Sequence, residues 1–353
     1  MKVDAQERNV ILLGDALEVL RSLRTDLVDT VVTSPPYFLL RNYQADGQLG
    51  LEATVDSYVR NLLNVTDELG RVLKPTGSMW LNLGDSYSRH HRYGAAPKSL
   101  LLVPERVLLG LAEHGWIVRN VIVWHKPNPM PASVRDRLSC THERLFLLVR
   151  SERYFFDLDA IRVPHVSRRR GLTASRHCAM SNTGTPRPQS SRPKYESSRL
   201  RWAGPLAGSN DGLARARAEG RAGHRLGKNP GDVWRVATAG YRGAHFATFP
   251  PSLIEPPLQA SCPARTCRAC GTPWLQQLGE ARRPACGCRA DWQPGLALDP
   301  FMGAGTTGVV ARKLGRDFLG IELNPIYRQL ALTRIADSQV RVSPTGDPTS
   351  RSR

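Results

Sequence analysis

Two consecutive prolines directly after a short apolar run constrain this chain more than any other local feature. Residues 28–32 (Val-Asp-Thr-Val-Val) are rich in β-branched side chains and predict a buried strand. Residues 33–37 (Thr-Ser-Pro-Pro-Tyr) end that strand, because each proline fixes φ near about −65° and lacks an amide hydrogen. The sequence therefore predicts a stiff turn at the carboxyl end of a strand, where open α/β sheets bind their ligands.

This turn offers groups that can hold a flat amine. The Ser34 hydroxyl and the Ser34 and Pro35 carbonyls are acceptors, and the Tyr37 ring can stack. The alternative is an ordinary apolar turn after a core strand. Ser34-Pro35-Pro36-Tyr37 resembles the catalytic motif of the amino-group DNA methyltransferases, Asp/Asn/Ser-Pro-Pro-Tyr/Phe. The resemblance implies that Ser34, Pro35, Pro36 and Tyr37 are catalytic and act on a base that has left the duplex.

A second motif lies near the other end of the sequence. Residues 296–307 predict a strand, a glycine-rich turn and the start of a helix, and residues 316–322 predict a strand that ends in an acid. An acid in that place can grip a ribose diol. The segment resembles the S-adenosylmethionine loop of the same enzymes. The resemblance implies cofactor binding by Asp299, Pro300, Phe301, Gly303, Gly305, Thr306, Thr307 and Glu322.

Two further segments are predicted to contact the same cofactor. Asp15 follows a predicted strand, and in the family an acid in such a place contacts the adenine ring. An N-cap that opens the next helix is the alternative, and the two roles are compatible. Phe249 and Pro250 resemble the family segment beside the methionine end of the cofactor, where they would supply apolar contact.

The chain is strongly basic. Its 353 residues include 49 Lys or Arg against 31 Asp or Glu, a formal net charge of +18, which favours a polyanionic partner. A ribosomal or membrane-surface protein could be equally basic. Fifteen basic residues and only three acidic ones fall in residues 162–230, which are rich in Ser, Gly and Pro. This insert is predicted to contact double-stranded DNA. A disordered insertion is the alternative, and the two are compatible if the insert orders on DNA.

Five of the seven cysteines fall in residues 262–288. Cys267-Arg-Ala-Cys270-Gly has the spacing of a zinc knuckle, and Cys286-Gly-Cys288 follows after a hairpin-sized interval. The sequence predicts that Cys267, Cys270, Cys286 and Cys288 hold a structural zinc ion, with Cys262 as a spare ligand. Reduced cysteines without a metal are the alternative.

No run of about 18 apolar residues predicts a transmembrane helix, and residues 1–8 are too polar for a signal peptide. We therefore expect a cytoplasmic protein, associated with the bacterial nucleoid, that binds no membrane. A homodimer is left open.

The resemblance covers roughly residues 10–160 and 231–335 and implies an α/β fold of the S-adenosylmethionine-dependent methyltransferase (Rossmann-like) type. The expected sheet has seven strands and is mixed, with one strand inserted antiparallel. The catalytic motif precedes the cofactor motif, as in the β group of the family, a circular permutation of the common fold. The expected parts are a catalytic part (1–161), a basic target-recognition insert (162–230), a cofactor part (231–340) with the zinc knuckle (262–288), and a disordered tail (341–353).

The expected activity is methyl transfer from S-adenosylmethionine to the N4 amino group of cytosine, for restriction–modification or epigenetic marking. Ser before Pro-Pro-Tyr is commoner in the cytosine enzymes of the family and Asp in the adenine enzymes, so N6-adenine methylation is the first alternative. The others are an RNA or protein-glutamine methyltransferase, and a zinc-containing DNA-binding protein with an inactive methyltransferase fold. The absence of a Pro-Cys motif argues against carbon-5 cytosine methylation.

Overall fold

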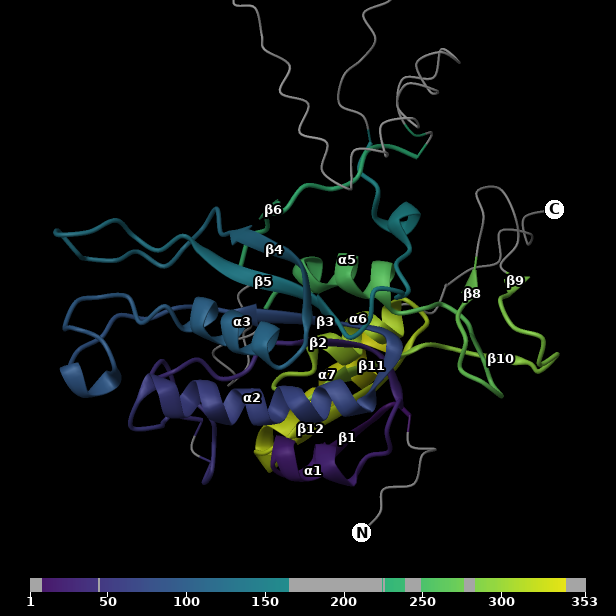
Figure 1. The fold of residues 1–353 in the computed structure, drawn as a ribbon, viewed down its shortest axis with the longest axis horizontal. Helices are drawn as coiled ribbons and strands as arrows, with labels where there is room; N and C mark the ends of the chain where they lie inside the picture. The colour runs from purple at the N-terminus through teal and green to yellow at the C-terminus, as the bar shows by residue number, and fades with distance from the viewer. Residues whose placement is uncertain are drawn as a thin grey trace, which may run out of the picture. The chain divides into compact units, whose positions relative to one another are not determined.

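The structure is a computed structural model that describes residues 8–43, 45–164, 224, 226–238, 249–275 and 283–340 (Figure 1). The chain divides into two compact units, residues 1–161 with 231–353, and residues 162–230. In the described part of the second unit, Val163 and Lys228 pair through an antiparallel bridge. The first unit contains the β-sheet and the helices that pack on it.

Eight strands of the first unit form one sheet, in the order β1-β12-β11-β2-β3-β5-β4-β6. The strands are β1 (Val10–Leu13), β2 (Val28–Thr33), β3 (Leu73–Leu83), β4 (Ile117–His125), β5 (His142–Val149), β6 (Val233–Arg235), β11 (Leu296–Asp299) and β12 (Asp317–Glu322). Strand β5 is antiparallel to both of its neighbours, β3 and β4, and the other neighbouring pairs are parallel.

A mixed sheet was expected, and the sheet is mixed. The prediction of seven strands is wrong, because β6 pairs in parallel with the end of β4 and adds an eighth strand at that edge. Three residues are too few to show an alternating pattern, so the sequence carried no signal for β6.

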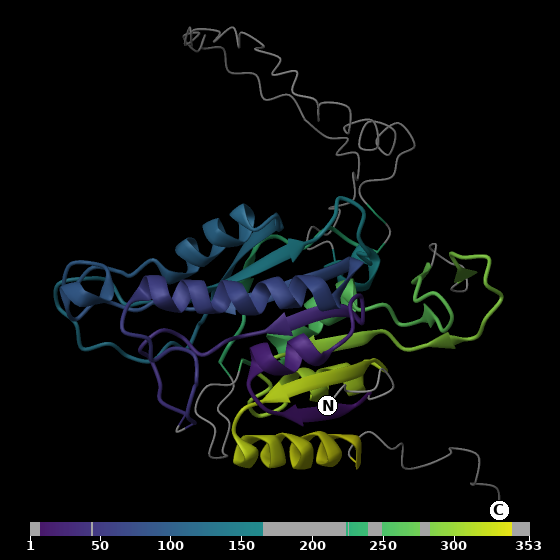
Figure 2. The same ribbon diagram turned by 60° about the horizontal axis from the view of Figure 1, so that its bottom comes forward.

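Helices cover both faces of the sheet, as Figures 1 and 2 show. On one face lie α1 (Ala16–Ser22), α2 (Val55–Val72) and α3 (Val103–Glu113), and on the other lie α5 (Pro251–Ser261), α6 (Thr306–Lys313) and α7 (Pro325–Val340). None of the described helices combines the length and the apolar content needed to span a membrane.

Alternating side chains of the central strands fill the two cores. In β3, Met79 and Leu81 pack toward α1, α2 and α3, whereas Trp80 packs toward α5 and α6. In β11, Leu296 and Leu298 belong to the first core and Ala297 to the second. Because both faces are buried, the strands read as continuous apolar runs in the sequence. This sandwich fixes the carboxyl ends of β2, β11 and β12, where the candidate site lies.

Four short strands form a small module before β11. They are β7 (Thr266–Cys267), β8 (Trp274–Leu275), β9 (Arg283–Pro284) and β10 (Trp292–Gln293), paired as β7 with β10 and β8 with β9. Strand β10 ends three residues before β11 begins. The module therefore adjoins the amino end of β11, and Figure 1 shows it projecting at the right of the sheet.

Candidate active site

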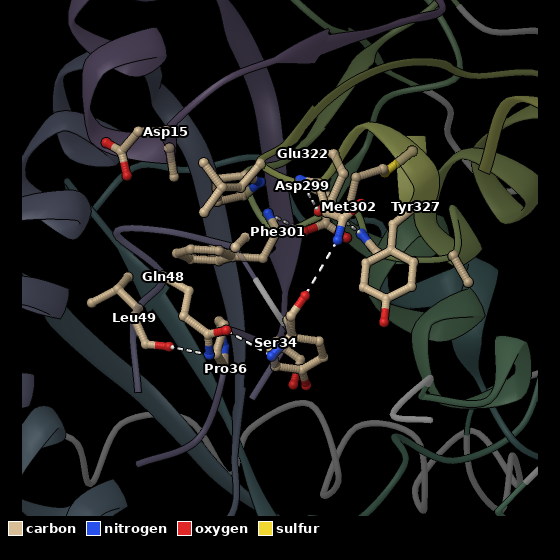
Figure 3. Close-up of a pocket in the computed structure, with 18 of the residues that line it drawn as sticks. Asp15, Ser34, Pro36, Gln48, Leu49, Asp299, Phe301, Met302, Glu322 and Tyr327 are labelled. Carbon is tan, nitrogen blue, oxygen red and sulfur yellow. Dashed lines mark hydrogen bonds between the residues drawn. The ribbon is translucent and has the colours of Figure 1, made fainter. Parts of the chain in front are cut away.

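One pocket lies at the carboxyl ends of β1, β2, β11 and β12, where the two sequence motifs meet (Figure 3). Figure 3 shows Asp299 and Glu322 on one side of it and Ser34 and Pro36 on another. Its lining includes ten predicted site residues: Asp15, Ser34, Pro36, Phe249, Asp299, Pro300, Phe301, Gly303, Thr306 and Glu322. The other predicted residues of the two motifs, Pro35, Tyr37, Gly305 and Thr307, adjoin this lining in the chain, as Pro250 adjoins Phe249.

Asp299 ties the two motifs together at the end of β11. Its Oδ1 accepts hydrogen bonds from Thr33 Oγ1 at 2.7 Å and from the Phe301 amide at 3.1 Å, and its Oδ2 accepts one from Thr307 Oγ1 at 2.7 Å. Burial raises the pKa of Asp299 to about 6, and these hydrogen bonds oppose that rise. The carboxylate thus links the last residue of β2 to the turn and to the first residues of α6.

Glu322 shapes the glycine-rich turn from the neighbouring strand. Its Oε2 accepts from the Gly303 amide at 2.7 Å and its Oε1 from the Asn324 amide at 2.9 Å, and burial raises the pKa of Glu322. Gly303 and Gly305 have φ of 50° and 76°, the left-handed region that favours glycine. A Cβ on Gly305 would also lie 2.9 Å from Ala331 Cβ of α7. The turn conformation therefore favours glycine at both positions, and the packing of α7 requires it at position 305.

Asp15 and Phe249 reach the same pocket from other elements. Asp15 is the N-cap of α1, and its Oδ1 accepts from the amides of Leu17 and Glu18 at 2.9 and 3.0 Å. The N-cap prediction is confirmed, and because Asp15 also lines the pocket, the cofactor contact stays a prediction compatible with it. Pro250 is the N-cap residue of α5, and Phe249 before it lines the pocket.

The Ser-Pro-Pro-Tyr turn is held from two sides. Tyr58 of α2 donates a hydrogen bond to the Pro36 carbonyl at 2.8 Å. Gly84, just after β3, lies against the Tyr37 ring, since a Cβ added there would come within 2.6 Å of Tyr37 Cε2. Ser34 is half-buried and lines the pocket. The position of Tyr37 therefore depends on the absence of a side chain at position 84.

A polar network behind the turn was not predicted from the sequence. Tyr37 donates its hydroxyl hydrogen to Glu143 Oε2 at 2.7 Å, and Asn82 Nδ2 donates to the same oxygen at 3.0 Å. Lys126 Nζ pairs with Glu143 Oε1. Ser34 Oγ donates to the Tyr37 hydroxyl oxygen at 3.2 Å. His142 and Glu143 are the first two residues of β5, and nothing in the sequence connected Glu143 to the turn.

Several lining residues were also missed by sequence reasoning. Asn324 Nδ2 donates to the Tyr43 carbonyl at 3.2 Å, and the rings of Tyr43 and Tyr327 pack edge to face (T-shaped), with centroids 6.3 Å apart. The segment after the Ser-Pro-Pro-Tyr turn is thereby joined to the end of β12. The missed residues of the lining include Tyr43, Gln48, Leu49, Met302, Asn324 and Tyr327. For Tyr43, Gln48 and Leu49 the signal was an irregular segment containing an aromatic residue, whereas Met302 lies within the glycine-rich motif and Asn324 and Tyr327 follow the acid that ends β12.

The cysteine cluster lies in the small module, away from this pocket. The sulfur atoms of Cys267, Cys270, Cys286 and Cys288 all lie within 4.8 Å of one another. Cys262 is not among them; it is buried at the end of α5 against the core. Sulfur ligands around zinc lie about 2.3 Å from the metal, and tetrahedral geometry then places them roughly 3.8 Å apart. The four thiols fit such an ion with small side-chain adjustments.

The basic insert falls largely outside the described residues, so its predicted contacts with DNA are not addressed by the structure. The same holds for the predicted disordered tail, residues 341–353.

A doubly covered α/β sheet with a glycine-rich turn and an acid at the carboxyl ends of neighbouring strands is typical of proteins that bind a nucleotide cofactor. Residues 28–333 match the DNA methylase family of N6- and N4-methyltransferases. The chain belongs to this family.

Relatives with curated descriptions are similar in sequence to nearly the whole chain. The type II methyltransferase M.SfiI of Streptomyces fimbriatus is 36% identical over 403 residues, which cover 90% of this chain and 88% of that protein. The type II methyltransferase M.SmaI of Serratia marcescens is 32% identical over 346 residues, covering 92% and 90%.

Solved structures share the fold. The PvuII DNA methyltransferase (cytosine-N4-specific) has a TM-score of 0.56 at 17% identity, covering 95% of this chain and 92% of that one. A putative DNA modification methylase from Thermus thermophilus, solved with S-adenosyl-L-methionine, has a TM-score of 0.50 at 21% identity, covering 94% and 95%. At these identities the likeness concerns the arrangement of helices and strands.

Proposed function

We propose that this chain transfers a methyl group from S-adenosylmethionine to the N4 amino group of cytosine in double-stranded DNA, as the modification enzyme of a restriction–modification system. The observation that carries the proposal is that residues of both motifs line one shared pocket, and that a hydrogen bond of 2.7 Å joins Thr33 Oγ1 to Asp299 Oδ1 next to it. The type II methyltransferases among its relatives support the assignment to restriction–modification. The motif order supports the β group and its circular permutation.

The pocket fits S-adenosylmethionine by the chemistry of its lining. Carboxylates of Asp15 and Glu322 can accept hydrogen bonds from amino and hydroxyl groups, and Phe249 and Phe301 offer rings beside them. When bound, S-adenosylmethionine supplies a methyl group on a positively charged sulfur. In this assignment Asp299, Gly305 and Thr307 shape the turn, while Pro300, Gly303 and Thr306 form its surface toward the cofactor.

The target base is held by the Ser-Pro-Pro-Tyr turn. The Ser34 hydroxyl and the Pro35 carbonyl accept from the exocyclic amino group, and Tyr37 stacks on the base. These acceptors direct the nitrogen lone pair toward the methyl carbon, so that the N–C bond forms as the S–C bond breaks. The nitrogen then releases one proton to solvent. Catalysis is by positioning and electrostatics and needs no covalent intermediate.

The choice of base is tested by nucleoside mass spectrometry. DNA methylated by the protein should contain N4-methylcytosine, as Ser34 before Pro-Pro-Tyr suggests. N6-methyladenine alone would overturn the cytosine assignment while leaving the methyltransferase assignment intact. Sequencing of the methylated DNA from an expressing host would give the recognition sequence at the same time.

Residues 162–230 are assigned to DNA recognition because of their charge. Arg side chains that neutralise phosphates release counterions, so DNA binding should weaken steeply as salt is raised. Deletion of residues 168–225 should abolish site-specific methylation and leave cofactor binding intact. Unchanged specificity in that deletion would place recognition in other loops.

The cysteine module is assigned a structural zinc ion, held by Cys267, Cys270, Cys286 and Cys288. The four clustered thiols support this, and the module adjoins the amino end of β11, the end opposite to the pocket. Metal analysis should return about one zinc per chain. A metal-free protein that is folded and fully active would exclude the assignment.

A further inference from the structure

A continuous chain of hydrogen bonds leads from the pocket to a carboxylate behind it. Ser34 Oγ lies 3.2 Å from the Tyr37 hydroxyl oxygen, which lies 2.7 Å from Glu143 Oε2. Ser34 lines the pocket, whereas Glu143 does not. The Glu143 side chain is 14% exposed and belongs to β5, the antiparallel strand of the sheet. The pocket surface and strand β5 are thus connected through two hydroxyl groups.

The carboxylate fixes the direction of this chain. An ionised carboxylate only accepts hydrogen bonds, so the Tyr37 hydroxyl must give its single hydrogen to Glu143. The tyrosine oxygen can then only accept from Ser34, and the Ser34 hydrogen points away from the pocket. The lone pairs of Ser34 Oγ therefore remain free to accept a hydrogen bond from a donor in the pocket. An exocyclic amino group is such a donor.

Two neighbours hold Glu143 in this role. Lys126 Nζ pairs with Oε1, and the Lys126 ammonium also lies 4.6 Å from the Trp124 ring centroid. Asn82 Nδ2 donates to Glu143 Oε2 and to the Arg144 carbonyl, both at 3.0 Å. Because Asn82 Nδ2 donates to two acceptors, the side-chain amide of Asn82 is oriented with its nitrogen toward Glu143. A second contact of the Tyr37 hydroxyl, to Asn82 Oδ1, is longer at 3.3 Å.

The charges and the burial around Tyr37 favour the protonated form of its hydroxyl. Burial raises the pKa of Tyr37 well above its usual value, and the Glu143 carboxylate raises it further. A phenolate at this position would face Glu143 as a like charge and could not donate.

We propose that Glu143 is a positioning residue of the methyl transfer, which acts through Tyr37 to keep the Ser34 hydroxyl oriented as an acceptor for the target amino group. The inference rests on the proposed function. It assigns a role to strand β5 and to the Lys126–Glu143 pair that neither motif contains. A purely structural alternative exists, since Lys126 and Glu143 also join the ends of β4 and β5.

A double-mutant cycle between Glu143→Gln and Ser34→Ala separates these alternatives. Glutamine has nearly the same size as glutamate, but its amide can also donate a hydrogen bond to the Tyr37 hydroxyl. The Tyr37 hydroxyl is then no longer forced to donate to residue 143, and the Ser34 hydroxyl is no longer forced to donate to Tyr37. Glu143→Gln alone should lower kcat roughly 10- to 100-fold, since small misplacements of reacting groups have effects up to about 100-fold. The KM values for cofactor and DNA should change less than about twofold.

In the Ser34→Ala background, Glu143→Gln should have almost no further effect on kcat, because its effect passes through Ser34. Tyr37→Phe keeps the ring and removes the connecting hydroxyl. In that background too, Glu143→Gln should therefore have almost no further effect on kcat. The matched control is Glu105→Gln, which removes a carboxylate 3.5 Å from Arg144, the next residue of β5, and should leave kcat unchanged.

Multiplicative effects of Glu143→Gln and Ser34→Ala, or an unchanged kcat in Glu143→Gln, would overturn the role of Glu143. That outcome is distinct from failure of the proposed function, in which the parent protein itself would produce no methylated cytosine or adenine. Thermal unfolding of each variant shows whether a lost kcat reflects loss of the folded protein.

Discussion

The two halves of the candidate site satisfy their polar groups in different ways. On the side assigned to the cofactor, most partners are close in the sequence: Asp299 accepts from Phe301 and Thr307, two and eight residues away, and Glu322 accepts from Asn324 and Gly303, two and 19 residues away. Thr33 is a distant donor to Asp299, 266 residues away. On the target side, the partners of Glu143 lie 17 to 106 residues from it in the sequence. The first half is encoded mostly by residues 299–324, and the second is assembled by the pairing of β2, β3, β4 and β5.

This difference predicts which substitutions separate the two halves. Changes in the glycine-rich turn should remove cofactor binding, whereas changes around Tyr37 should lower turnover with the cofactor still bound. A variant that affected both equally would show that the pocket acts as one unit.

The largest effect is expected for Gly303→Val. Gly303 has φ of 50°, where a β-branched residue is strained by roughly 1–3 kcal/mol, and the side chain would occupy the pocket surface. Cofactor affinity should fall on the order of 100-fold in calorimetry. Gly315→Val is the matched control, because Gly315 also has positive φ, at 66°, and a Cβ there meets no atom within 4 Å. Parent-like affinity in Gly303→Val would remove the turn from the cofactor site.

A smaller effect on the other half is expected for Gly84→Ala. The new Cβ would lie 2.6 Å from Tyr37 Cε2, so the ring has to move. Steady-state kinetics should show kcat lowered roughly tenfold, with cofactor affinity kept. Gly231→Ala, which places its Cβ in open space, is the control. A lost cofactor affinity in Gly84→Ala would contradict the separation of the two halves.

The smallest effect concerns the pH dependence of stability. Burial raises the pKa of Asp299 from 3.8 to about 6 in the folded protein, so the folded state binds this proton more tightly than the unfolded state. Its contribution to the unfolding free energy therefore becomes more favourable as pH falls from 7 to 5, by about 1 kcal/mol, and is lost as pH rises through 6.

Denaturant titrations of the parent and of Asp299→Asn at pH 5 and pH 7 measure this contribution as the difference between the two proteins. The asparagine has no such proton, so its unfolding free energy should lack this component. The same dependence in both proteins would mean that Asp299 does not titrate in this range.

The local half of the site could be predicted from the sequence, and most of the distant half could not. Asp299, Gly303 and Glu322 share one strand–turn–helix–strand succession whose residue types follow from the turn itself. Glu143 and Lys126 resemble ordinary ends of two strands, because a pairing across a sheet leaves no pattern in either strand. Strand β6 was missed because its three residues are too few for an alternating pattern, and its partner β4 lies some 110 residues earlier in the chain.

The pairing of β2 with β11, two strands that lie far apart in the sequence, also affects folding during synthesis. Asp29 and Thr33 of β2 bond Leu296 and Asp299, which are 267 and 266 residues away. At about 5–20 residues per second, a ribosome needs tens of seconds to deliver β11 after β2 has emerged. During that time β2 has an open edge on the β11 side, and open edges promote aggregation. Slower synthesis of the final third of the chain should therefore lower the soluble yield.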